Sequence, residues 1–267
     1  MKILVCIKQV PGTTAVEVDP ETGVLRRSGV PGKMNPYDLY AIELALQLRE
    51  RFGGHVEALT MGPPQAQAVL REAIYMGADG GCLLTDQAFA GADVLATVKA
   101  LRSACQCIGA FDLIVCGKQT TDGDTAQVGQ ELAELLGIPH VTNVTAVNQV
   151  TQDKVILQAD IGDTLFTLEA TLPCLLCVDG GINTPRLPSY RRIFDRGTAD
   201  LPVLTLSDLA DSDPTHYGLK GSPTQVERIF PPLKNDDRRR FTGTGQQLAQ
   251  TLYDVLVEEK FLELNHG

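Results

Sequence analysis

The chain has fewer basic than acidic residues. Its 267 residues hold 23 lysines and arginines against 33 aspartates and glutamates, which gives a formal net charge of −10 at pH 7. A protein that binds nucleic acid through the phosphate backbone needs a basic face. The balance of charge therefore argues against a general role on nucleic acid.

Apolar runs of membrane length are also missing from the sequence. The N-terminal run over residues 2–8 is apolar, but it is too short for a bilayer span or for the core of a signal peptide. We expect it to be a buried strand, and we expect no membrane span later in the chain. The composition, 43% hydrophobic and 21% charged, is typical of a globular protein.

Residues that bind metals or form disulfides are few and scattered. The four histidines form no ligand cluster, and the number of cysteines, seven, is odd. Cys174 and Cys177 are tempting as a redox or metal pair, but they lie within an apparent strand, where a spacing of three points the side chains to opposite faces. We therefore predict reduced cysteines, no metal site and a cytoplasmic protein.

Strands and helices alternate through the first half of the chain. Apolar runs predict strands over residues 2–8, 55–61, 81–84 and 111–116. Helical periodicity predicts helices over 36–52, 64–75 and 93–108, the first with Asn35 as its cap and Pro36 at its first position. This order predicts an α/β fold with a doubly wound, mostly parallel sheet. The loops 8–11, 61–63 and 117–125 would then meet at the carboxyl edge of that sheet.

The stretch from Val115 to Pro139 carries the strongest local signal. A strand breaks at Gly117 into a polar loop, and Leu132 lies on the apolar face of the helix that follows. The first turn of a helix presents unpaired N–H groups and partial positive charge, which suits a phosphate. Alternatively, the carboxylate of Asp122 or Asp124 caps the helix and no ligand is involved.

The second half of the chain is richer in predicted strands. Short β-type runs at 141–150, 154–160, 164–170 and 174–178 predict strands added antiparallel to the edge of the sheet. A small hairpin is predicted within residues 16–25. We place a nucleotide-binding α/β domain at 1–204, with an excursion at 183–200. Residues 205–267 are predicted to be an extended arm with a final helix over about 244–264, docked on another subunit.

The excursion gathers basic and aromatic residues. Residues 186–197 contain four arginines and one aspartate, a local charge of +3, with Tyr190, Ile193 and Phe194 among them. Arginine and aromatic residues together are typical of protein interfaces, so we predict a partner-binding element. The alternative is a helix whose apolar side packs on its own domain.

Four motifs in order give the chain a family resemblance. They are Cys6–Pro11, Met34–Asp38, Met61–Pro63 with Met76–Asp79, and Gly117–Gln119 with Asp122–Gly129. The chain resembles, from end to end, the β subunit of electron transfer flavoproteins. It is most similar to the electron-bifurcating and nitrogen-fixation-type branch of that family.

The resemblance implies an adenine-nucleotide α-hydrolase-like domain paired with an α subunit that holds an FAD. It also implies that the C-terminal arm embraces that α subunit. The nucleotide contacts that it implies fall on Cys6, Asn35, Pro36, Tyr37, Asp38, Met61, Gly117, Lys118, Gln119, Thr120, Thr121, Asp122, Gly123, Asp124, Thr125, Ala126, Gln127 and Val128.

The resemblance leaves two cofactors open in the crevice. An FAD that accepts electrons from NADH would serve bifurcation between ferredoxin or flavodoxin and a flavin-dependent dehydrogenase. An AMP would make the chain a respiratory-type subunit that serves acyl-CoA dehydrogenases. We favour FAD, because the small residues Gly123, Thr125 and Ala126 leave room for a pyrophosphate. A nucleotide-binding signalling protein of the same fold is a third reading, and the basic excursion and the long arm argue against it.

The excursion lies where the family carries its recognition loop for dehydrogenases of the acyl-CoA type. This sequence departs from the family pattern there, because Leu187-Pro188 follow Arg186 and arginines replace a lysine-rich run. The partner is therefore expected to be a flavin-dependent dehydrogenase of the acyl-CoA or another type. The residues predicted to bind it are Arg186, Tyr190, Arg191, Arg192, Ile193 and Phe194.

Overall fold

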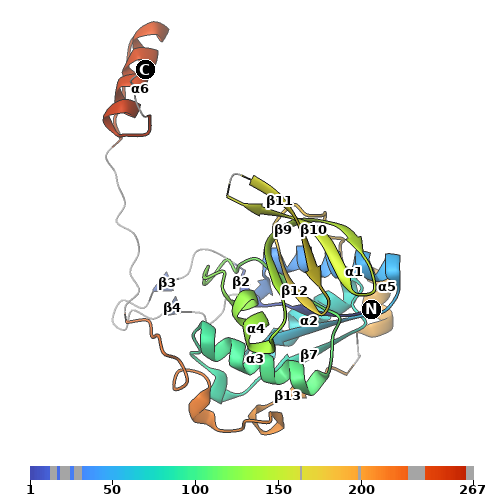
Figure 1. Cartoon of the computed structure of the whole chain (residues 1–267). Coiled ribbons are helices and arrows are strands. Elements are labelled where there is room, and N and C mark those ends of the chain that lie inside the picture. The colour runs from blue at the N-terminus through green and yellow to red at the C-terminus, as the bar shows by residue number, and fades with distance from the viewer. Residues whose placement is uncertain are drawn as a thin grey trace. The chain divides into compact units, whose positions relative to one another are not determined.

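The computed structural model describes residues 1–12, 17–18, 25–26, 32–162, 164–197, 200–227 and 238–262. Its packing divides the chain into two units, Met1–Glu227 and Arg228–Gly267. The first unit, in Figure 1, is a sheet with helices on both faces. Each unit is described by itself below.

One large sheet organises the first unit. Its strand order is β11-β10-β9-β12-β8-β1-β6-β7-β13. The strands are β1 (Lys2–Cys6), β6 (His55–Met61), β7 (Gly80–Leu84), β8 (Leu113–Gly117), β9 (His140–Val150), β10 (Lys154–Ile161), β11 (Thr164–Thr171), β12 (Cys174–Val178) and β13 (Val203–Leu204). All described neighbours pair in parallel except β9 with β10 and β10 with β11. The predicted α/β class, mostly parallel with an antiparallel addition, is confirmed.

Strand β9, predicted to be antiparallel, joins the sheet through parallel pairing with β12. Strand β12 was predicted to be antiparallel at the sheet edge as well, but it lies inside the sheet and pairs in parallel with both β8 and β9. All five of its residues are buried. A short, continuously apolar strand such as Cys174–Val178 is typical of a strand covered on both faces, and this explains its central position.

Helices cover both faces of the sheet, as the alternation predicted. They are α1 (Pro36–Phe52), α2 (Gln67–Met76), α3 (Val94–Ile108), α4 (Val128–Leu136) and α5 (Tyr190–Arg196), with short 3₁₀ turns η1 (Pro64–Ala66) and η2 (Gln87–Phe89). Ile3 and Val5 of β1 belong to a core with Ile42 of α1. Leu4 belongs to a second core, on the opposite face, with Leu132 of α4.

Two small antiparallel pairs lie outside the main sheet. Strands β2 (Gln9–Pro11) and β5 (Gly32–Met34) pair with each other directly after the end of β1. Strands β3 (Glu17–Val18) and β4 (Leu25–Arg26) form the predicted hairpin, whose turn lies outside the described residues.

The segment after β13 packs on the first unit. It carries two 3₁₀ turns, η3 (Leu206–Asp208) and η4 (Pro214–His216). Leu209 and Tyr217 are buried in the same core as α3, and the Tyr217 hydroxyl donates to the backbone oxygen of Asp211 at 2.8 Å. Contacts therefore hold the chain to the α/β body as far as Glu227.

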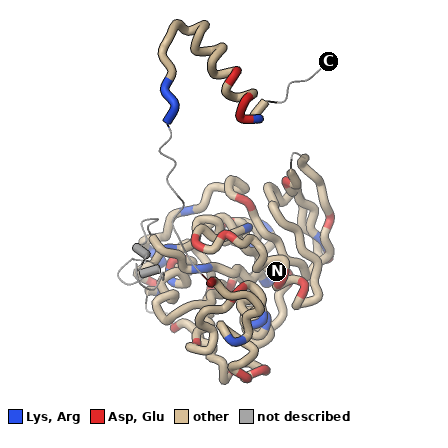
Figure 2. The backbone as a smooth tube through the Cα atoms, turned by 90° about the vertical axis from the view of Figure 1, so that its left-hand side faces the viewer, with Lys and Arg blue, Asp and Glu red and all other residues tan. Residues whose placement is uncertain are grey.

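The second unit is built on one helix, α6 (Gly245–Glu258). Thr244 and Gln247 form a reciprocal capping box at its start. A run of arginines, Arg238–Arg240, precedes the helix and acidic residues end it, as the colours in Figure 2 show. None of its residues is buried, so its predicted docking on an α subunit stays a prediction. No helix in the described part of the chain is long and apolar enough to cross a membrane.

Candidate functional site

Four parallel strands deliver polar residues to one edge of the sheet. Strands β1, β6, β8 and β12 run in the same direction, so their carboxyl ends lie together. Lys8, Met61 and Lys118 follow or end three of these strands, as predicted, and Asp179 follows the fourth. The expected convergence of distant loops at one edge of the sheet is therefore present in the fold.

Asn35 joins the start of α1 to the loop after β8. It occupies the N-cap position, as predicted, but its side chain makes no cap hydrogen bond. Its Nδ2 donates instead to Asp38 Oδ1 and to the Gln119 backbone oxygen, both at 2.9 Å. Its Oδ1 accepts from Thr121 N at 3.2 Å. Because Asn35 is fully buried, these bonds fix loop 118–127 against α1 without competition from water.

Asp38 holds the end of β1 against the same helix. Its Oδ2 accepts a 2.7 Å hydrogen bond from Lys8 N, and the residue is 4% exposed. Burial raises the pKa of this carboxyl to about 7, although hydrogen bonds from Asn35, Lys8 and Gly117 act in the opposite direction. The side chain of Asp38 ties the end of β1 to the start of α1, and its predicted contact with a nucleotide stays a prediction.

Gly117 is required by the close approach of β8 to α1. A Cβ added there would lie 2.5 Å from Asp38 Oδ1 and 2.8 Å from the backbone carbon of Tyr37. Any side chain would push the strand end away from the helix. Gly117 therefore lets loop 118–127 begin directly against the first turn of α1.

Helix α4 begins without a side-chain cap. Its cap position is Gln127, and no side-chain cap bond is made. The alternative that Asp122 or Asp124 caps the helix is wrong. Asp122 pairs with Lys8 Nζ at 2.8 Å, and Asp124 accepts from Gln119 Nε2 at 2.7 Å.

Backbone N–H groups are left available where loop 118–127 meets α4. Within the described chain, the N–H groups of Thr125, Ala126, Gln127 and Val128 donate to no protein acceptor. Asp124 and Ala126 adopt positive φ of 51° and 53°, and left-handed residues of this kind occur in turns that bind anions. Free N–H groups at the start of a helix suit a phosphate.

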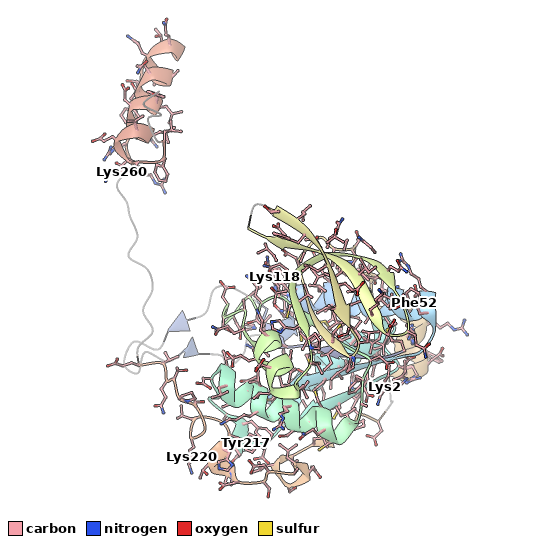
Figure 3. All side chains as sticks on the ribbon, viewed as in Figure 1. Lys2, Phe52, Lys118, Tyr217, Lys220 and Lys260 are labelled. Atoms are coloured by element: carbon pink, nitrogen blue, oxygen red, sulfur yellow. The ribbon has the colours of Figure 1, made fainter. Side chains whose placement is uncertain are left out.

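Lys118 is held at the mouth of the crevice by a residue that the sequence did not reveal. Its Nζ lies 2.9 Å from the carboxylate of Asp179 and 5.6 Å from the centre of the Tyr37 ring. The hydrogen bond to Asp179 raises the pKa of Lys118. Figure 3 shows Lys118 in the loop that leaves β8. If β12 had been predicted as a parallel neighbour of β8, Asp179 at its carboxyl end would have been expected near Lys118.

The predicted residues that remain show how a ligand would meet the chain. Cys6 is 9% exposed, so its side chain is almost fully covered. Met61 ends β6 and is half-buried. Pro36 stands at the first position of α1. Thr120 accepts from Asp124 N through its backbone oxygen at 3.1 Å.

Gly123 has open space around it. A Cβ there would make only an ordinary contact of 3.6 Å with Thr120 Oγ1. The packing of the chain therefore does not require glycine at this position, unlike at Gly117. The absence of a side chain leaves room beside the free N–H groups of the loop.

The basic excursion is helix α5, and its aromatic side faces solvent. Tyr190 and Phe194 are 86% and 87% exposed. The alternative, in which the apolar side packs on its own domain, does not describe these two residues. Ile193 is 40% exposed, and Arg191 pairs with Asp195 at 3.4 Å.

Two of the predicted partner-binding arginines point inward instead. Arg186 binds Glu43 at 2.8 Å and Glu50 at 2.6 Å. Arg192 donates to the backbone oxygen of Gly77 at 2.9 Å. These two residues position α5, and Tyr190, Arg191 and Phe194 stay exposed for a partner.

Comparison with known proteins identifies the family of this chain. A family model described as "Electron transfer flavoprotein domain" matches residues 22–209. The chain belongs to the electron transfer flavoprotein family. The resemblance seen in the four sequence motifs is therefore confirmed.

Relatives within the electron transfer flavoprotein family cover nearly the whole chain. The chain is 45% identical over 257 residues to electron transfer flavoprotein subunit beta of Thermoanaerobacterium thermosaccharolyticum, covering 96% of this chain and 98% of the relative. It is 41% identical over 262 residues to protein FixA of Bradyrhizobium diazoefficiens, covering 96% and 91%. It is 40% identical over 264 residues to the caffeyl-CoA reductase-Etf complex subunit CarD of Acetobacterium woodii, covering 98% and 100%. The chain thus resembles β subunits of the bifurcation-type branch.

Proposed function

We propose that this electron transfer flavoprotein chain is the β subunit of a heterodimer and binds FAD in the crevice between α1 and α4. The observation that carries the proposal is the row of free N–H groups at Thr125–Val128, beside the open space at Gly123. When bound, the FAD would supply hydride acceptance from NADH and single-electron donation to ferredoxin or flavodoxin and, through an FAD of the α subunit, to a dehydrogenase.

The residues of the crevice fit a dinucleotide by their chemistry. The N–H groups at the start of α4 suit phosphate oxygens, and Lys118, which pairs with Asp179, brings a positive charge. Backbone at Cys6 and Met61 would meet adenine and ribose. Asn35 and Asp38 act one step away, because they hold loop 118–127 and the end of β1 against α1. No side chain needs to act as a nucleophile or a general acid.

The neighbourhood of Gly123 favours FAD over AMP. A mononucleotide ends at one phosphate, whereas a dinucleotide needs space for a second phosphate and the chain beyond it. Gly123 and Ala126 leave that space, and nothing in the packing of the chain itself demands glycine at 123. The alternative, a structural AMP in a subunit that accepts electrons from acyl-CoA dehydrogenases, would use the same N–H groups and leave this space empty.

The partner surfaces follow from what the structure leaves exposed. Helix α6 buries none of its residues, and we assign it to the α subunit. Helix α5 exposes Tyr190 and Phe194, and we assign it to a flavin-dependent dehydrogenase. The relative CarD is named as a subunit of a caffeyl-CoA reductase-Etf complex, which supports a partner of that broad kind.

A cytoplasmic location is part of the same proposal. All seven cysteines are free, and six of them are buried. Burial raises the pKa of thiols such as Cys82 and Cys174 to about 11. Unpaired, protonated cysteines are expected in a reducing compartment, where ferredoxin or flavodoxin would also be found.

Quantifying the nucleotides of the purified αβ complex tests the proposal. Acid should release two FAD per complex and no AMP, and NADH should bleach flavin absorbance without any dehydrogenase present. One FAD with one AMP would refute the FAD assignment. A Gly123→Val variant provides a matched probe, because its side chain would fill the space used only by a dinucleotide. We expect this variant to lose the β-subunit FAD while the α-subunit FAD stays bound.

A further inference from the structure

A segment of eight residues runs from the nucleotide crevice to the recognition helix. Residues 179–186, called the strap below, begin where β12 ends and lead towards α5, which lies against α2. At its first residue, Asp179 binds Lys118 Nζ at 2.9 Å. At its last residue, Arg186 binds Glu43 and Glu50 of α1. The strap is thus fixed at both ends by ion pairs.

The middle of the strap follows α1 as well. Asn183 Nδ2 donates to the backbone oxygen of Tyr40 at 3.0 Å. A Cβ at Gly180 would meet the rings of Tyr37 and Tyr40 at 3.6 and 3.7 Å, so the backbone there runs directly over both tyrosines. These are first-turn and second-turn residues of the helix that starts at the crevice.

Helix α1 also connects loop 118–127 to helix α5. At its start, Asn35 holds loop 118–127. Near its end, Arg49 donates to the backbone oxygen of Gly77 at 2.8 Å, and Arg192 of α5 donates to the same oxygen at 2.9 Å. The strap and α1 therefore both connect the region of loop 118–127 to helix α5.

The two ends of the strap differ in how firmly they hold. The Glu43 side chain is 5% exposed, and breaking its pair with Arg186 would leave a buried charge without a partner. Lys118 and Asp179 are each 24% exposed, so this pair is partly open to water. The strap also carries an unsatisfied acceptor, because Asn183 Oδ1 is buried without a hydrogen bond. A small shift of the strap that gave this atom a donor would be favourable.

We propose that the strap couples nucleotide binding in the crevice to the mobility of α5. The coupling rests on the proposed function, since it takes the nucleotide phosphates to lie beside Lys118. Phosphate competes with Asp179 for Lys118 Nζ and repels the Asp179 carboxylate, so binding releases the first end of the strap. The buried Glu43–Arg186 pair then becomes a pivot, and α5 gains freedom to adapt to its dehydrogenase. Coupling is reciprocal, so a partner seated on α5 in turn changes the affinity for nucleotide.

Hydrogen exchange of the full αβ complex tests this coupling. The β subunit is compared without nucleotide, with FAD and with AMP, and exchange is followed separately in loop 118–127 and in α5. We expect nucleotide to slow exchange in the loop and to speed exchange of residues 190–196 about fivefold or more, the lower end of usual coupling factors. The Ile193 amide, which donates to Ser189 O at 3.0 Å, is a suitable reporter.

Variants separate the strap from general loosening. At nucleotide concentrations that protect the loop, Asp179→Asn should abolish the response of α5, whereas Asp179→Glu should retain the response. Glu43→Gln should make α5 exchange quickly with or without nucleotide. Glu169→Gln, which removes the exposed Lys154–Glu169 pair on β10 and β11, is the matched control and should behave as wild type.

The outcomes distinguish this inference from the proposed function. Loop protection without any change in α5, slower exchange in α5, or an unchanged response in Asp179→Asn would each overturn the coupling and leave the nucleotide site standing. Protection by AMP but not by FAD, with the response of α5 intact, would refute the FAD assignment and support the coupling. If neither nucleotide protects the loop, both proposals fail.

Discussion

The buried carboxyl of Asp38 makes a specific prediction about stability and pH. Its pKa is raised from 3.8 to about 7 because the side chain is buried where α1 meets β1 and β8. Between pH 3.8 and about pH 7 the Asp38 carboxyl is protonated in the folded chain and ionised in the unfolded chain. The contribution of Asp38 to stability is therefore fully present below pH 3.8 and is lost as the pH rises through 7.

The size of the effect follows from the same two values. A pKa difference of this size corresponds to about 4 kcal/mol between the extremes of pH. Between pH 5 and pH 8 the share that is lost is about 2–3 kcal/mol. Asp38→Asn removes the titrating proton and keeps the shape of the side chain. Relative to this variant, wild type should become less stable by that amount as the pH rises from 5 to 8.

Urea unfolding at both pH values, followed by circular dichroism, measures this difference. Asp122→Asn is the matched control. The pKa of Asp122 is lowered, mainly by its bond to Lys8, so its contribution is present above its ordinary pKa and lost only at lower pH. The difference in the free energy of unfolding between wild type and Asp122→Asn should therefore stay constant from pH 5 to 8.

A constant difference between wild type and Asp38→Asn across this range would refute the reasoning about burial. A direct measurement is available if the variant folds poorly. The infrared C=O band of a protonated carboxylic acid should persist in wild type at pH 5 and disappear with a midpoint near 7.

Two further predictions concern the strand end and the recognition helix. Gly117→Ala should destabilise the chain by about 1–3 kcal/mol in urea unfolding, the usual cost of overpacking, because the new methyl group would lie 2.5 Å from Asp38 Oδ1. Gly123→Ala should cost far less, and equal stability of all three proteins would show that β8 can move away from α1. Tyr190→Ala with Phe194→Ala should weaken dehydrogenase binding about thirtyfold, as for a loss of ~2 kcal/mol at a hot spot, with nucleotide content unchanged. Leu165→Ala, at another exposed apolar residue, is the control, and loss of nucleotide from the double variant would show that α5 supports the crevice.

Much of the fold could be read from local signals. Buried strands β1, β6 and β7 are short apolar runs, and α1 begins at Pro36 and ends before Gly53 as these residues predict. The orientation of β12 could not be predicted in this way, because an apolar run shows that a strand is buried but not which strands it pairs with. Its unbroken apolar character was nonetheless a sign of a covered, parallel strand.

The candidate site shows the same limit. The sequence located loop 118–127 and Asn35, since glycine, proline and polar residues mark the ends of strands and helices. It could not show that Lys8 pairs with Asp122, or that Lys118 pairs with Asp179, because each pair joins residues far apart in the chain. Likewise, the count of arginines in the excursion could not show that Arg186 and Arg192 point inward.

The central place of β12 has a consequence for how the chain is made. Translation delivers β8 first and its neighbour β12 only after β9, β10 and β11 have been synthesised. Until then the edge of β8 that β12 will cover has no partner, and an open apolar edge favours association between chains. Lys118 N donates to the Val178 oxygen at the very end of β12. The nascent loop that is to receive a nucleotide can therefore take its final shape only when this late strand enters the middle of the sheet.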